Sequence, residues 1–116
     1  MADRVIFMGW NRPVAGREKQ AMQLFQKSLE FWNRLQKEGK IESFEPVQLA
    51  FHGGDLNGFL LIKCSAQKIM EIQGDSEFID MVVEAGYCLE GYGHIVGYVG
   101  EGLTGIFSRW AKFISG

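Results

Sequence analysis

The sequence predicts an α+β domain in which two helices cover one face of an antiparallel sheet. Four short runs rich in apolar residues alternate with two amphipathic helical stretches, in the order β-α-β-β-α-β. The 116 residues, 47% of them hydrophobic and 22% charged, suffice for one compact domain with its own core. We therefore expect a single domain over residues 1–116, with its core at about 4–100 and an additional helix at about 103–114.

The first half of the chain predicts one strand and one long helix. Residues 5–10 form a continuous apolar run too short for a helix, and Pro13 follows, so we expect a central strand buried on both faces. Apolar residues then recur at helical spacing from about Arg17 to Lys37 and form a wide stripe. Gly39 follows the basic end of this stretch, as is common at a helix C-terminus.

The second half predicts a hairpin and an interrupted helix. Residues 43–52 and 58–65 flank a stretch of turn formers, which indicates two strands joined by a rather long loop. Ser65 can cap a following helix, which the segment 74–77 interrupts and restarts. This helix is expected to end within residues 86–93.

The last part of the chain predicts a fourth strand, at 94–99, and a terminal helix with an apolar face. This helix is expected to cover the edge of the sheet, in its own subunit or across a dimer. Arg109 and Lys112 would also suit a membrane surface, but two cations support that alternative only weakly.

Apolar residues fall on both faces of the predicted sheet, because side chains alternate along a strand. If one set lies beneath the helices (Phe7, Val47, Leu49, Phe51, Leu60 and Ile62), a second set must face the other way (Ile6, Met8, Trp10, Phe44, Ala50, Phe59 and Leu61). The second set would form a larger apolar patch than monomers usually expose. We therefore expect another protein layer to cover it.

The element order is that of a ferredoxin-like sandwich. Combined with the two-sided apolar sheet, it resembles the dimeric α/β barrel superfamily, in which two ferredoxin-like subunits pack sheet against sheet. The resemblance covers about residues 4–100 and rests on architecture, so no family within the superfamily is assigned and no catalytic residue carries over. It implies a homodimer formed through the sheet face, with a chamber between the two sheets.

Several polar residues on or near this face are candidates for ligand binding: Trp10, Asn11, Gln48, His52, Lys63 and Tyr98. A few convergent polar groups between apolar walls are what a small-molecule site requires, so the predicted ligand is small and apolar or aromatic. Alternatively, these side chains lie at strand ends and simply reach water.

His94 and Arg12 are the candidate catalytic residues. In the ferredoxin-like topology we expect the first and third strands to run parallel, which gathers six residues at one mouth of the barrel: Trp10, Asn11, Arg12, Lys63, Tyr92 and His94. His94 could transfer a proton near neutral pH, and Arg12 could hold a carboxylate or an enolate. The alternative is that His94 is a solvated histidine without a role.

The sequence predicts no cofactor and no metal. Cys64 and Cys88 form no CxxC pair, and His52 and His94 are expected at opposite ends of the sheet. Residues 100–105 spell GxGxxG, but only eleven residues follow, too few for a nucleotide-binding unit. The predicted helices contain no histidine, which disfavours the haem chemistry of some members of the superfamily.

The formal charge of −2 gives no general attraction to nucleic acid or to an anionic membrane, so neither is expected as a partner. Reduced cysteines and the lack of an export-type segment favour a cytoplasmic protein. The first functional hypothesis is a small-molecule-binding dimeric barrel, with monooxygenase-like or isomerase-like chemistry that needs no cofactor. The alternative is a non-catalytic homodimeric or protein-interaction module, in which the space between the sheets is packed solid.

Overall fold

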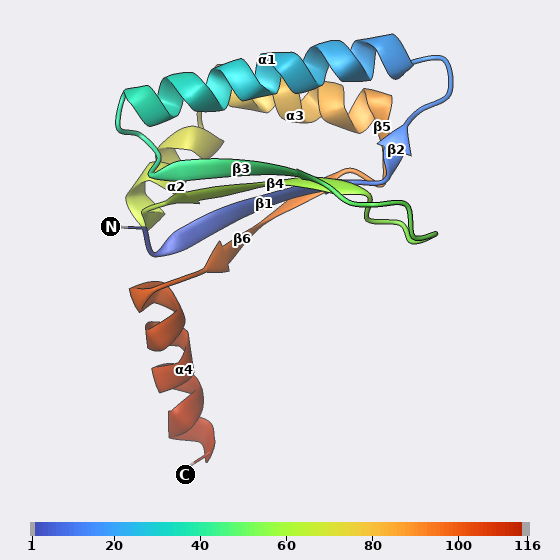
Figure 1. The fold of residues 1–116 in the computed structure, drawn as a ribbon. Helices are drawn as coiled ribbons and strands as arrows, with labels where there is room; N and C mark the ends of the chain where they lie inside the picture. The colour runs from blue at the N-terminus through green and yellow to red at the C-terminus, as the bar shows by residue number, and fades with distance from the viewer. Residues whose placement is uncertain (1, 115–116) are drawn as a thin grey trace.

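The computed structural model describes residues 2–114 and contains a four-stranded antiparallel sheet with helices on one face (Figure 1). Its strands are β1 (Arg4–Trp10), β3 (Ser43–Gln48), β4 (Gly58–Cys64) and β6 (Gly93–Tyr98). They lie in the order β3-β4-β1-β6, and every neighbouring pair is antiparallel. The predicted α+β fold class, with the ferredoxin-like strand order, is confirmed.

Three helices cover one face of the sheet: α1 (Glu18–Lys37), α2 (Ala66–Gln73) and α3 (Ser76–Cys88) (Figure 1). The predicted interruption separates α2 from α3. Ser65 Oγ accepts a hydrogen bond from the Lys68 amide at 3.2 Å, and Asp75 Oδ1 accepts one from the Phe78 amide at 3.0 Å. Helices α2 and α3 therefore each start at a side-chain cap of their own.

A second, two-stranded sheet consists of β2 (Arg12–Pro13) and β5 (Leu89–Glu90). The Asn11 amide donates to the Glu90 carbonyl at 2.9 Å, and the Val14 amide donates to the Cys88 carbonyl at 2.8 Å. These strands are too short to leave a periodic pattern, and the sequence did not predict them. They join the end of β1 to the end of α3.

The face assignment predicted for β1 is wrong. In an antiparallel pair, directly opposite residues point to the same face, and Ile6 lies opposite Ile62 while Met8 lies opposite Leu60. All four are buried in the core beneath the helices. Trp10 and Phe44 also pack against this core, so the helix side contains four residues that were expected on the other face (Ile6, Met8, Trp10 and Phe44).

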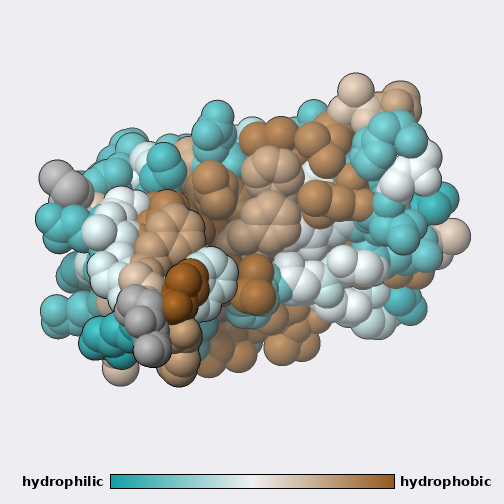
Figure 2. Space-filling view, turned by 90° about the horizontal axis from the view of Figure 1, so that it is seen from below, coloured by the Kyte–Doolittle hydropathy of each residue, from teal (hydrophilic) through white to brown (hydrophobic). Residues whose placement is uncertain are grey.

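The opposite face of the sheet, which we call the open face, carries Phe7, Phe59, Leu61 and Ile95. Val47 belongs here as well, not beneath the helices, and β3 ends before Leu49 and Phe51. Phe7 and Phe59 contact each other with ring centroids 5.0 Å apart. Figure 2 views the molecule from this side and shows apolar side chains gathered over the middle of the sheet.

The terminal helix α4 (Glu101–Ile114) projects away from the sheet on the side opposite α1 and α3 (Figure 1). Its apolar side chains stay largely exposed, including 61% of Trp110. Within one chain α4 therefore does not cover the sheet edge, contrary to one of the two predicted arrangements. Among residues 2–114, no helix is long and apolar enough to span a membrane.

Candidate functional site

A pocket of about 360 Å³ lies between the sheet and the helices α1 and α3. Its walls come from β1 and the facing strands (Met8, Trp10, Gln48 and Leu60), from α1 (Ala21, Met22, Leu24, Phe25 and Ser28), from α3 (Met81 and Ala85) and from the rim (Pro13, Leu89 and Tyr92). The pocket therefore lies within one chain on the helix side of the sheet, not in the predicted chamber between two sheets.

Aromatic and methionine side chains form most of the pocket wall. The Trp10 ring meets the Phe25 ring edge to face, with centroids 6.0 Å apart. Gly58 lies opposite Trp10 in the sheet, and a Cβ atom at Gly58 would come within 2.7 Å of the indole. The glycine thus allows the indole to lie across β4. Flat, polarisable walls of this kind suit an apolar or aromatic ligand.

Besides the Trp10 indole, three of the lining residues bring polar side-chain groups to this otherwise apolar pocket. Gln48 Nε2 donates to the Asn57 carbonyl at 2.8 Å and to the Leu49 carbonyl at 3.2 Å, which leaves the Gln48 side-chain oxygen as an acceptor. Ser28 Oγ contacts Met81 Sδ at 3.8 Å. The third group is the Tyr92 hydroxyl, so the pocket can both donate and accept a hydrogen bond.

Tyr92 connects the pocket to His94. The Tyr92 hydroxyl lies 3.4 Å from His94 Nδ1, and the His94 ring packs edge to face against Phe78 of α3 at a centroid distance of 5.7 Å. Burial raises the pKa of Tyr92 to about 12. The hydroxyl is therefore protonated near neutral pH and can donate a hydrogen bond.

The structure brings together some of the predicted site residues. Trp10 and Gln48 line the pocket, and His94 lies directly behind Tyr92. Asn11 lies at the nearby rim, where its Oδ1 accepts a hydrogen bond from Asn57 Nδ2 at 2.7 Å. Asn11 thus fixes the β3–β4 loop to the end of β1.

Lys63 and Tyr98 lie at the other end of the sheet. The first and third strands of the main sheet, β1 and β4, run antiparallel, so the expectation that they run parallel is wrong. Lys63 consequently lies opposite Val5, and Tyr98 lies opposite Arg4, whose guanidinium is 4.6 Å from the tyrosine ring centroid. Neither residue lines the pocket.

Arg12 and His52 are exposed, and each contacts residues in its immediate surroundings outside the pocket. Arg12 lies on β2, with its Nε 3.8 Å from Glu90 Oε2. His52 Nε2 is 2.9 Å from the Leu56 carbonyl, and its Nδ1 accepts a hydrogen bond from the Gly54 amide at 3.2 Å. His52 therefore holds the β3–β4 loop in shape, outside the pocket wall.

Sequence reasoning missed the contribution of α1 and α3 to the pocket. The available signal was the unusual width of the α1 stripe, whose N-terminal half includes Met22 and Phe25. Both remain exposed beside the pocket, while Ala21 and Leu24 of the same half of the helix are buried.

Within residues 2–114, no group of three His, Cys, Asp or Glu side chains is arranged to hold a metal ion. Cys64 and Cys88 are both buried, and burial raises the pKa of the Cys64 thiol to about 11. Both thiols therefore pack as small apolar groups.

No family model and no curated protein matches the chain. The solved structures that are similar in fold include the following two. A dimeric protein of unknown function and ferredoxin-like fold from Bacteroides fragilis is 10% identical, with a TM-score of 0.58, and the match covers 83% of this chain and 96% of that one. SnoaB, a cofactor-independent oxygenase from Streptomyces nogalater, is 15% identical, with a TM-score of 0.54 and coverage of 85% and 95%. At these identities the likeness shows the ferredoxin-like fold alone.

Proposed function

We propose that this protein binds a small, largely apolar ligand with an aromatic ring in the pocket between the sheet and helices α1 and α3. The observation that carries this proposal is the pocket itself, which has about 360 Å³ of space, apolar walls and a few polar groups. This volume is in the range typical of small-molecule sites. The Tyr92 hydroxyl, which can accept as well as donate, and the Gln48 side-chain oxygen would orient a ligand that has a phenol or a carbonyl group.

As an enzyme, the protein would oxygenate such a ligand without a cofactor, the activity named for SnoaB. A phenol whose ring system contains an activated CH₂ group can supply the electrons itself. The CH₂ carbon becomes a carbonyl, one atom of O₂ enters it, and the other atom leaves as water with the two hydrogens. His94 would accept a substrate proton through the Tyr92 hydroxyl. Arg12, which lies outside the pocket wall, has no role in this proposal.

The ligand proposal is tested with dithranol, a tricyclic phenol that has one activated CH₂ group. Binding is measured calorimetrically without oxygen in the wild-type protein and in Ala85→Phe, which places a ring in the pocket. Val83→Phe adds a ring to the exposed side of the same helix and is the matched control. We expect Ala85→Phe to abolish binding and Val83→Phe to retain it.

Equal affinity in the wild-type protein and Ala85→Phe would contradict the pocket as the binding site. Because a ring at residue 85 could also disturb the packing of α3, Ala21→Leu on α1 fills the same pocket from the opposite wall. Admission of oxygen then tests the chemistry through conversion of dithranol to the anthraquinone. Binding without conversion would indicate a binding module instead of an oxygenase.

We also propose that two copies pair through their open faces, as the apolar composition of that face favours. The Bacteroides fragilis relative is a dimeric protein, which supports this arrangement. Sedimentation of the wild-type chain is the test, and a monomer at micromolar concentration would contradict it.

A further inference from the structure

Helix α4 has an apolar stripe that residues 2–114 leave largely exposed. The stripe recurs at helical spacing along α4 and consists of Leu103, Ile106, Phe107, Trp110, Phe113 and Ile114. Phe107 is 53% exposed and Phe113 is 86% exposed, while the Phe107 and Trp110 rings stack with centroids 5.7 Å apart. A helix of this length has little stability without a packing partner, so the stripe requires a surface to contact.

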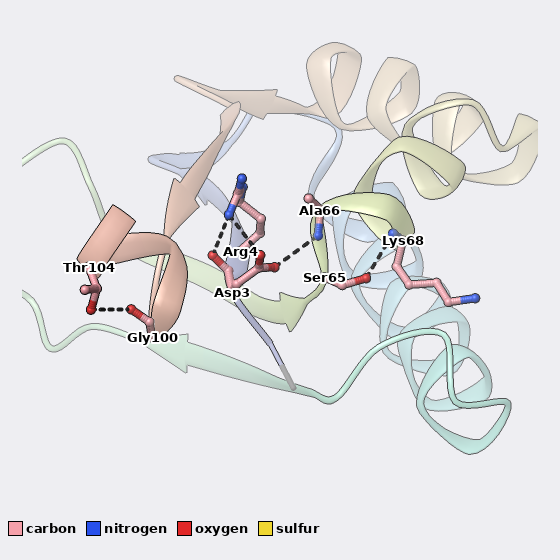
Figure 3. Close-up of polar contacts among 7 residues, drawn as sticks. All are labelled: Asp3, Arg4, Ser65, Ala66, Lys68, Gly100 and Thr104. Carbon is pink, nitrogen blue, oxygen red and sulfur yellow. Dashed lines mark hydrogen bonds and ion pairs between the residues drawn. The ribbon is translucent and has the colours of Figure 1, made fainter. Parts of the chain in front are cut away.

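The segment that leads into α4 is hydrogen-bonded to the residue just before β1. The Val99 amide donates to the Asp3 carbonyl at 3.2 Å, and the Gly102 amide donates to the Val99 carbonyl at 3.0 Å. Any side chain at Gly102 would collide with the Asp3 carbonyl, and Gly100 has a positive φ of +54°. Figure 3 shows Gly100 and Thr104 beside Asp3 and Arg4. The direction of α4 is therefore set by this contact with the sheet.

That direction carries α4 away from the sheet on its open-face side, beginning near one end of the sheet (Figure 1). The 14 residues of α4 span roughly 21 Å at 1.5 Å per residue. A second sheet packed on the open face would lie about 10 Å away. The helix is thus long enough to extend beyond the sheet of the second copy.

We infer that α4 packs along the sheet edge of a second copy of this chain. In the resulting dimer, the terminal helix of each copy contacts the other copy. The exposed area of the α4 side chains supports a second copy as the partner. The three aromatic side chains of α4 leave on the order of 400 Å² uncovered. A stable interface needs about 800 Å² per partner, so the aromatic side chains of α4 supply roughly half of that area and the open face would supply the rest.

Charge also favours a second copy over a membrane. The polar side of α4 carries Arg109 and Lys112, while Glu45 is exposed on the edge strand β3 and shares the open face with Leu61. A partner's α4 can pair its cations with this carboxylate. Two cations on a chain with a formal charge of −2 give only a weak attraction to anionic lipid.

Photo-crosslinking tests the contact directly. Benzoylphenylalanine replaces Phe107 on the apolar side of α4 or, as the control, Ser108 on the polar side. We expect irradiation of the full chain to give a covalent dimer at least fivefold more efficiently from position 107. Crosslinks from position 107 that stay within one chain would overturn the inference.

Sedimentation gives an independent measurement. We expect Trp110→Glu with Phe113→Glu to raise the dimer dissociation constant at least tenfold, and Ser108→Glu to leave it within twofold of wild type. An unchanged constant in the double variant would overturn the inference, as would a monomeric wild-type chain that binds phosphatidylserine vesicles through α4. Dithranol binding reports on the pocket separately, because the pocket is formed within one chain and is expected to persist in these variants.

Discussion

The Tyr92 hydroxyl and His94 Nδ1 lie 3.4 Å apart, and only Tyr92 of this pair lines the pocket between the sheet and the helices. The pair therefore connects the pocket to an ionisable ring, with the phenol as the group nearer a ligand. This relationship makes Tyr92 the first residue to test.

Replacement of Tyr92 by Phe removes the donor and keeps the ring. We expect dithranol to bind about fivefold more weakly, because one neutral hydrogen bond is worth about 1 kcal/mol. Calorimetry without oxygen provides the measurement. Tyr87→Phe alters an exposed tyrosine outside the pocket wall and is expected to bind as wild type does.

The half-buried phenol of Tyr92 also predicts a pH dependence of stability. The pKa of Tyr92 is raised to about 12, against about 10 in an unfolded chain, so the folded protein holds this proton more tightly. Its contribution to stability is complete below about pH 10 and is lost as the pH rises through about 12. Urea unfolding at pH 8, 10 and 11 should show a steeper loss in wild type than in Tyr92→Phe. Parallel profiles would contradict the burial of this hydroxyl.

Gly58→Ala tests the position of the Trp10 indole. A Cβ atom at residue 58 would lie 2.7 Å from Cζ2 of Trp10, so the ring must move and change the pocket wall. We expect altered tryptophan fluorescence and at least a threefold loss of dithranol affinity. Gly93→Ala has no atom within 4 Å of the added carbon and is the control.

The two faces of the sheet can be distinguished by isoleucine truncation. Ile6 is 1% exposed beneath the helices, whereas Ile95 is 68% exposed on the open face. We expect Ile6→Ala to lower the free energy of unfolding by about 3 kcal/mol, because it leaves a cavity in packed core. Ile95→Ala should cost less than about 1 kcal/mol at concentrations where the protein is monomeric. Equal losses would argue against the face assignment.

The start of α3 depends on its cap. Asp75→Ala removes the acceptor of the 3.0 Å bond from the Phe78 amide, and we expect a loss of about 1 kcal/mol in urea unfolding. Asp80→Ala removes an exposed carboxylate from the interior of the same helix and should change stability by less than half as much.

The helices and the four strands of the main sheet were predictable because their signals are local. The Ser65 and Asp75 caps, the hairpin turn and the stripe of α1 each depend on residues close in the sequence. The site was less predictable. Trp10 and Gln48 were identified as candidates, but Lys63 and Tyr98 were placed with them although the antiparallel register puts both at the far end.

The sequence by itself determined the order of the elements, the α+β class and the excess of apolar surface on the sheet. Only the tertiary structure decided which face of β1 lies beneath the helices, and hence that the pocket is formed within one chain. The physical reason is that β1 is apolar at nearly every position. Side-chain alternation leaves no pattern in such a strand, so packing against α1 and α3 selects the buried face.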